Sequence, residues 1–163
     1  MAGKTSTYNF EMEDSILKYD PDKSTLLCVT KSADARKVWI KKLLDISDIS
    51  NIIEDGKRYY IVCESGDING QFLALSKSSG STVWFIPGKS FLQVLFKEFL
   101  YLIFIDENSH YYLLRVNCNN GKAVWHHRLD TDLFEYAFTK KDVRLSYSSG
   151  KKEVLSLRTG KRS

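Results

Sequence analysis

Residues Leu114–Trp125 read LRVNCNNGKAVW: an apolar strand, a polar turn that contains glycine, and a second strand that ends in Val-Trp. Nearly the same pattern occurs as LALSKSSGSTVW at Leu73–Trp84. A looser form, LCVTKSADARKVW, occupies Leu27–Trp39, where Ala35 replaces the glycine and the turn is one residue longer. The tryptophans that end these segments are 45 and 41 residues apart, and a period of ~40–45 residues is that of one four-stranded propeller blade. The sequence therefore predicts repeated β-hairpins.

A fourth, incomplete copy, VLSLRTGKRS, occupies Val154–Ser163. Between the tryptophans, short β-branched and aromatic runs alternate with polar turns of two to five residues, which is the pattern of hairpins. No segment shows helical apolar spacing over about ten residues or more. We therefore predict an all-β chain of antiparallel four-stranded meanders, a small or partial β-propeller of about four blades, forming one domain over residues 1–163. The expected units are residues 7–43, 49–88, 91–129 and 133–163.

The repeated tryptophans have a structural explanation. One four-stranded sheet cannot cover its own faces, so neighbouring units are expected to stack face to face. An indole at a fixed place in the last strand can then lie against the turn of the adjacent unit, where a glycine lets the ring approach the backbone. The predicted blade-docking residues are Trp39, Trp84, Trp125, Gly80, Gly121 and Gly160. The alternative, a stacking platform for a sugar or another ligand, does not require Val-Trp at the same strand position in every unit.

These segments resemble the repeat of pyrroloquinoline-quinone-type β-propellers, an apolar strand, a polar turn, Gly-Lys and then Trp. The resemblance covers three full units and part of a fourth, and it implies that each indole docks on the neighbouring blade. Two features depart from the family pattern: Trp39 lacks the upstream glycine, and Ser76 and Asn117 replace the usual aspartate. Enzymes of the family have seven or eight blades, a calcium site and two adjacent cysteines under the quinone. This chain has no adjacent cysteines, so the resemblance implies the non-enzymatic branch and no cofactor.

Reactive and metal-binding patterns are weak in this sequence. Cys28, Cys63 and Cys118 lack CxxC spacing, and the first two alternate with apolar neighbours as buried strand residues do. His126 and His127 are adjacent, and adjacent strand residues point to opposite faces, which favours a solvated pair over a metal site. We therefore predict no catalytic residue, no cofactor and no metal.

The charge is unevenly distributed. Net charge is +4, yet Lys140–Ser163 contains eight basic and two acidic residues, so this segment carries +6 and the remainder −2. Lysines that protect turns and an edge strand are the favoured explanation, and binding of an anionic polymer or lipid is the alternative. Nucleic acid is disfavoured because no aromatic stacking pattern accompanies the charge.

The function predicted from these patterns is a non-catalytic protein-interaction or scaffold module whose partner is another protein. The alternative is a small-ligand-binding or enzymatic fragment of a quinoprotein-like propeller. Expected surfaces are the turns Gly66–Gly70 and Glu107–His110 and an open edge strand, which also predicts self-association. The edge residues are Lys151, Lys152, Val154, Leu155 and Leu157. No apolar run has the length of a membrane span, and the amino terminus lacks a secretory apolar core; the compartment stays open, because a signal removed beforehand fits equally well.

Overall fold

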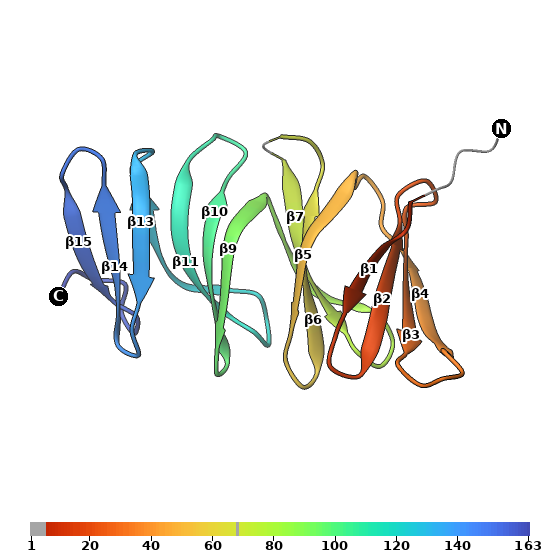
Figure 1. The fold of residues 1–163 in the computed structure, drawn as a ribbon. Helices are drawn as coiled ribbons and strands as arrows, with labels where there is room; N and C mark the ends of the chain where they lie inside the picture. Colours follow the sequence, from red (N-terminus) through yellow and green to blue (C-terminus); the bar gives the residue numbers. More distant parts are fainter. Residues whose placement is uncertain (1–5, 68) are drawn as a thin grey trace. The chain divides into compact units, whose positions relative to one another are not determined.

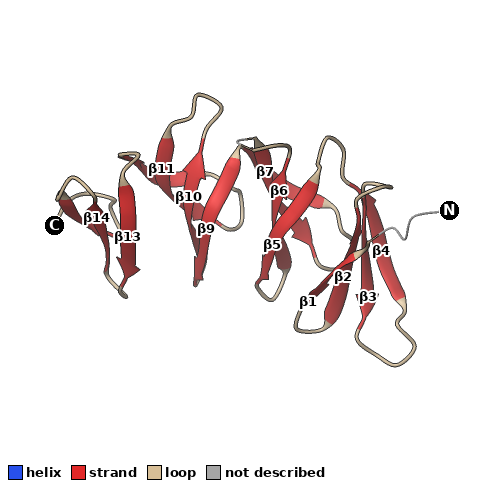
Figure 2. Ribbon diagram, turned by 45° about the horizontal axis from the view of Figure 1, so that its top comes forward, coloured by secondary structure: helices blue, strands red, loops and turns tan. Residues whose placement is uncertain are grey.

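The computed structural model describes residues 6–67 and 69–163 and consists of strands, turns and loops. The strands form four antiparallel sheets, and each is a meander in which consecutive strands are neighbours (Figures 1 and 2). The predicted all-β, propeller-type class is confirmed. Over the described ranges, no helix could cross a membrane. The predicted turn Gly66–Gly70 includes residue 68, which lies outside the described residues.

The chain divides into two compact units, Met1–Lys89 and Ser90–Ser163. The first unit contains β1 (Tyr8–Glu11), β2 (Ser15–Asp20), β3 (Thr25–Thr30), β4 (Lys37–Lys42), β5 (Asp48–Glu54), β6 (Arg58–Glu64), β7 (Gly70–Ser76) and β8 (Thr82–Pro87). The second contains β9 (Lys89–Phe96, from Ser90 on), β10 (Phe99–Ile105), β11 (Tyr111–Asn117), β12 (Ala123–Leu129), β13 (Leu133–Phe138), β14 (Asp142–Tyr147) and β15 (Lys152–Ser156). The sheets are β1–β4, β5–β8, β9–β12 and the three-stranded β13–β15.

The repeated Val-Trp pair marks a β-bulge. Trp39 is paired with Cys28, whereas the next residue of β3, Val29, pairs with Lys37, so Val38 is an extra residue in the strand. The same shift occurs beside the other two tryptophans. A bulge twists its strand and re-aims the side chains that flank it. The valine is consequently exposed in each case, while the indole that follows is buried or half-buried.

Each repeat glycine adopts the same left-handed turn. Gly80, Gly121 and Gly160 have φ of 71°, 70° and 68°. Each donates its N–H to the carbonyl oxygen four residues earlier, at 2.8–2.9 Å. Only glycine takes this conformation without steric cost. Ala35, the counterpart in the first copy, also has a positive φ, 43°.

Each unit has its own apolar core. In the first unit, buried side chains from the β1–β4 and β5–β8 sheets form one cluster, in which Leu17, Ile61 and Leu75 are fully buried. In the second, Leu113, Val143 and Leu155 form the centre of a cluster between the β9–β12 and β13–β15 sheets. The three cysteines are buried and unbridged.

Candidate functional site

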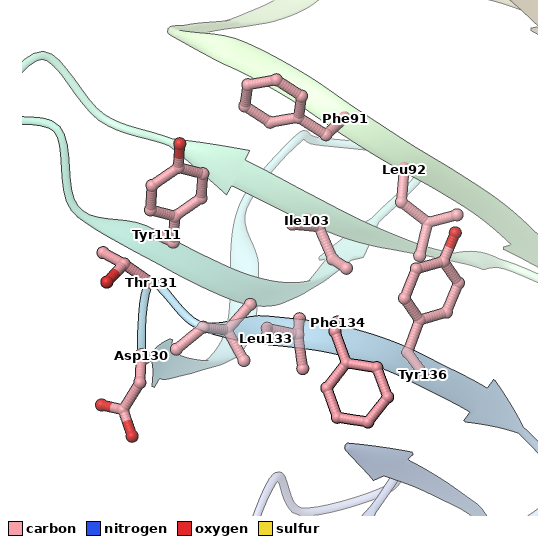
Figure 3. Close-up of a pocket in the computed structure, with 10 residues that line it drawn as sticks. Phe91, Leu92, Ile103, Tyr111, Asp130, Thr131, Leu133, Phe134 and Tyr136 are labelled. Carbon is pink, nitrogen blue, oxygen red and sulfur yellow. The ribbon is translucent and has the colours of Figure 1, made fainter. Parts of the chain in front are cut away.

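An apolar groove in the second unit lies between strands of its two sheets (Figure 3). Phe91 and Leu92 come from β9, an edge strand of its sheet, and Leu133, Phe134 and Tyr136 come from β13, an edge strand of the next. Ile103, Tyr111, Leu129, Asp130 and Thr131 complete the lining. The cavity volume is about 340 Å³, within the range of ~300–1,000 Å³ typical of ligand sites. We refer to it as the aromatic groove.

Three large rings of the aromatic groove face solvent. Phe91 is 51% exposed, Phe134 66% and Tyr136 45%. Phe134 is the extra residue of a bulge, because Leu133 pairs with Tyr147 and Glu135 with Ser146; the bulge explains why its ring points outward. Phe91 packs against Tyr111 with ring centroids 5.9 Å apart. Exposed aromatic side chains on two strand edges are typical of a binding surface.

The polar end of the aromatic groove does not supply a catalytic pair. Asp130 accepts a hydrogen bond from Lys151 Nζ at 2.8 Å, so this carboxylate is paired with a cation. Among the described residues that line the groove, Thr131 is the only serine or threonine. Among the residues that the structure describes, no three His, Cys, Asp or Glu side chains are grouped closely enough to hold a metal ion. The site is therefore suited to binding by apolar contact.

The expectation of a solvated histidine pair is wrong for His127. Its Nε2 lies 3.2 Å from Glu153 Oε2, and the side chain is only 21% exposed. Its neighbour His126 makes an edge-to-face contact with Tyr112. The sequence did not reveal the first contact because Glu153 is 26 residues away, on a strand of the next sheet.

Glu153 is the centre of a buried polar cluster in this unit. The carboxylate accepts hydrogen bonds from Tyr147 Oη at 2.8 Å and from Arg162 Nη2 at 2.7 Å and Nε at 3.1 Å. Burial by itself raises the pKa of this carboxyl, but the hydrogen bonds from Tyr147, Arg162 and His127 outweigh it and lower the pKa to about 2. Burial, followed by the bond to Glu153, raises the pKa of Tyr147. The cluster joins β12, β14 and β15 to the residues after β15.

Two predicted docking pairs lie within single units. Trp39 Nε1 donates to the carbonyl oxygen of Lys77 at 2.9 Å, and a Cβ added to Gly80 would lie 2.5 Å from the Trp39 ring. Trp125 Nε1 likewise donates to Leu157 O at 2.9 Å, and a Cβ on Gly160 would lie 2.5 Å from the indole. Trp84 is buried against the rings of Tyr60 and Phe72, with centroids 5.9 Å away in both cases. Gly121 occupies the equivalent turn in the second unit.

The predicted edge residues lie on or beside β15. The side chains of Leu155 and Leu157 are buried in the core, and Leu157 N–H donates to Lys141 O on the inner side of the sheet. Ser156 N–H donates to Lys161 O, and Ser163 N–H donates to Val154 O. Alternate strand residues direct their backbone groups to the same side, so the groups of Lys152 face this outer side as well. Lys152 is exposed, and Lys151 binds Asp130.

Sequence reasoning did not identify the aromatic groove. In a regular strand, strict alternation would place Phe134 and Tyr136 together on one face. The bulge at Phe134 breaks that alternation. The available signal was the high aromatic content of an edge strand that follows a polar turn, Asp130–Asp132.

No protein-family profile and no curated protein matches this chain. Its structure is similar to that of BamB from Moraxella catarrhalis, with a TM-score of 0.65, 14% identity, and coverage of 91% of this chain and 48% of BamB. It is also similar to the computationally designed Ika4 protein, with a TM-score of 0.63, 8% identity, and coverage of 95% and 93%. The C-terminal WD40 domain of Sif2 gives a TM-score of 0.63, 10% identity, and coverage of 98% and 49%.

This chain thus spans about half the length of the BamB and Sif2 chains that it matches. The similar structures are β-propellers, and at these low identities the similarity shows the fold. The all-β chain is therefore built from propeller-type blades.

Proposed function

We propose that this chain is a non-catalytic protein-interaction module, and that the aromatic groove binds an extended apolar segment of another polypeptide. The observation that carries the proposal is the exposure of Phe91, Phe134 and Tyr136 around one cavity. Aromatic side chains are enriched among the residues that dominate binding energy at protein interfaces. Each ring stands on a rigid strand rather than on a loop, so little conformational entropy is lost when a partner binds.

An extended segment fits the groove better than a globular partner. The groove lies between residues of β9 and β13, which are both edge strands, and edge strands offer backbone groups to an added strand. A cavity of about 340 Å³ has room for only a few side chains. An interface between two globular proteins involves many more residues, because it typically buries ~1,600 Å² of surface. The similarity to BamB and to a WD40 domain supports an interaction role at the level of the fold.

The proposal is tested with peptides. A random peptide display library is selected on the full chain, and the affinity of the enriched peptides is measured by fluorescence polarisation. We expect enrichment of peptides with aromatic and large aliphatic residues. Phe134→Ser should weaken their binding at least about tenfold, since a lost anchor ring costs about 2 kcal/mol. The matched control is Phe85→Ser, because Phe85 is also exposed (55%) but lies on β8.

Two results would contradict this function. Peptides whose affinity falls equally with Phe134→Ser and Phe85→Ser would bind exposed aromatic residues non-specifically. Selection of no peptide, together with binding of small apolar compounds that depends on Phe134 and Tyr136, would instead support the small-ligand alternative.

We further propose self-association through the outer side of β15. The β13–β15 sheet has three strands where the other sheets have four. Residues 161–163 cover the outer side of β15 at Val154 O and Ser156 N–H, and the backbone groups of Lys152 face outward before this covered part. Proline is tolerated on a strand edge where its missing N–H faces outward, so Val154→Pro should leave the fold intact. We expect a concentration-dependent dimer by sedimentation equilibrium that Val154→Pro abolishes; a monomer at all concentrations would refute the edge as a self-association site.

A further inference from the structure

A second cavity of the same unit differs from the aromatic groove in its charge. It has a volume of about 650 Å³, and its lining comes from the turn between β9 and β10, the turn between β13 and β14, β11 and the residues that follow β15. Its walls include Phe96, Phe99, Tyr101, Ser156 and Leu157. Its cations are Lys97, Arg115, Lys140, Lys141 and Arg158, and no carboxylate is among the lining residues. We refer to it as the basic cavity.

The five cations have no acidic partner in the described chain. Other basic residues of this unit form ion pairs: Arg162 with Glu153 at 2.7 Å, and Lys151 with Asp130 at 2.8 Å. None of the basic-cavity residues has a carboxylate oxygen within 4.0 Å in the described part of the chain. Like charges gathered without counter-charges raise the energy of the unbound state, and an anion that enters the cavity relieves this repulsion.

Arg115 is held in place within the basic cavity. Its guanidinium lies over the ring of Phe99, 3.8 Å from the centroid, and Nη1 donates to Arg158 O at 2.9 Å. Its Nε is buried and makes no hydrogen bond to any described residue. A planar guanidinium fixed by stacking is suited to bind phosphate oxygens through two parallel bonds. The stacking therefore orients one donor group before a ligand arrives.

The repeat provides an internal comparison. Leu157 N donates to Lys141 O and Lys77 N to Lys57 O, so these turns are equivalent in the two units. The residue opposite the tryptophan is Arg115 in the second unit and Cys28 in the first. The same register gives the other equivalent positions. In the first unit, Glu13 stands at the position of Lys97, Gly56 at that of Lys140 and Ser78 at that of Arg158. Four basic-cavity cations thus stand where the first unit has an acidic or uncharged residue.

The first unit also fills and neutralises its version of this space. Ser15 occupies the place that Phe99 has in the second unit. Its hydroxyl group is hydrogen-bonded to the hydroxyl group of Tyr59. Glu54 forms an ion pair with Lys77 at 3.2 Å and accepts the backbone N–H of Glu13. A positive and open cavity is therefore a specific feature of the second unit, and it is not a general consequence of the blade architecture.

We infer that the basic cavity binds a compact polyphosphorylated ligand, either a free polyphosphate compound or the headgroup of a phosphorylated lipid. Five cations exceed what one phosphate group can neutralise, while several clustered phosphates match them. Lysines on two hairpin turns supply mobile point charges, and Arg115 supplies the fixed, forked donor. This site is separate from the aromatic groove, so its failure would leave the proposed protein-interaction function standing.

The test uses sodium tripolyphosphate and the full chain in isothermal titration calorimetry at about 0.1 M NaCl, where distant surface charges are screened. The double variant K97A/K140A should weaken binding at least about tenfold, and Arg115→Gln should do the same. The matched control, K122A/R128A, removes the same charge from exposed positions of the same unit outside the cavity, and its affinity should stay within about twofold.

A second arm distinguishes the two sources of phosphate. Co-sedimentation with vesicles that contain phosphatidylinositol bisphosphate, but not with phosphatidylcholine vesicles, and its loss in K97A/K140A would identify the lipid headgroup. Tripolyphosphate binding without vesicle binding would identify a free compound. The inference is overturned if tripolyphosphate binds more weakly than about 1 mM or if both double variants lose affinity equally. It is also overturned if short duplex DNA binds more tightly and depends on Lys97 and Lys140, since the ligand would then be a nucleic acid.

Discussion

Replacing Glu153 by glutamine tests the buried carboxylate at the centre of the hydrogen-bonded cluster in the second unit. The side chain is 2% exposed and accepts hydrogen bonds from Tyr147, Arg162 and His127. A carboxyl pKa lowered from its ordinary 4.5 to about 2 corresponds to about 3 kcal/mol of stability at neutral pH. Glu153→Gln keeps the shape of the side chain but removes its charge, so the free energy of unfolding of this unit should fall by about 3 kcal/mol at pH 7.

The pH dependence has a defined sign. Because the folded-state pKa of Glu153 is lowered, its contribution is present above about pH 4.5 and is lost as the pH falls towards about 2. Urea unfolding, followed by circular dichroism and by amide hydrogen exchange in residues 90–163, should therefore show a difference between wild type and variant that shrinks over this range. Glu135→Gln, an exposed glutamate of the same unit, serves as the control. Equal stability of Glu153→Gln and wild type at pH 7, or an unchanged difference near pH 2, would refute the reasoning.

Two further predictions concern a buried thiol and a half-buried indole. Burial raises the pKa of Cys63 to about 12. Iodoacetamide should therefore leave this thiol unmodified in the native protein at mildly alkaline pH and modify it in urea, as measured by mass spectrometry. Modification of the native protein would show that the strand opens. Trp125→Phe keeps a ring but removes the bond to Leu157 O, and urea unfolding should show a loss of about 1 kcal/mol, whereas no loss would mean that the indole N–H adds nothing.

The blade architecture could be predicted from local patterns. The Val-Trp pair, the glycine four residues before it and the period of the copies all act within one hairpin, so each is visible in sequence. The bulge that explains the pair was not predicted, because a bulge depends on the register between two strands. Val38 and Trp39 have the same sequence signature whether the strand is regular or bulged.

The candidate sites could not be predicted, because each depends on residues that are distant in sequence. Phe91 and Phe134 line the same groove from two different sheets, and the exposure of Phe134 follows from a bulge. Arg115 lies opposite Trp125 in the register of β11 and β12, while Arg158 comes from beyond β15. The uneven charge of Lys140–Ser163 was visible in the sequence. Only the structure shows which of these cations are neutralised: Arg162 forms an ion pair with Glu153, whereas the lysines at 140 and 141 line the basic cavity with no such pair among the described residues.

The most direct test of the central structural claim, that an indole of one blade rests on the glycine turn of the next, is a double-mutant cycle between Trp39 and Gly80. Gly80→Ala should cost about 1–2 kcal/mol for its left-handed φ and a further ~1–3 kcal/mol for displacing the ring 2.5 Å away. In a Trp39→Ala background only the backbone cost should remain, which gives a coupling energy of about 1–3 kcal/mol. Gly66→Ala, at another positive φ but with no atom within 4 Å, should cost the same in both backgrounds. If Gly80→Ala also costs the same with and without Trp39, the account is contradicted.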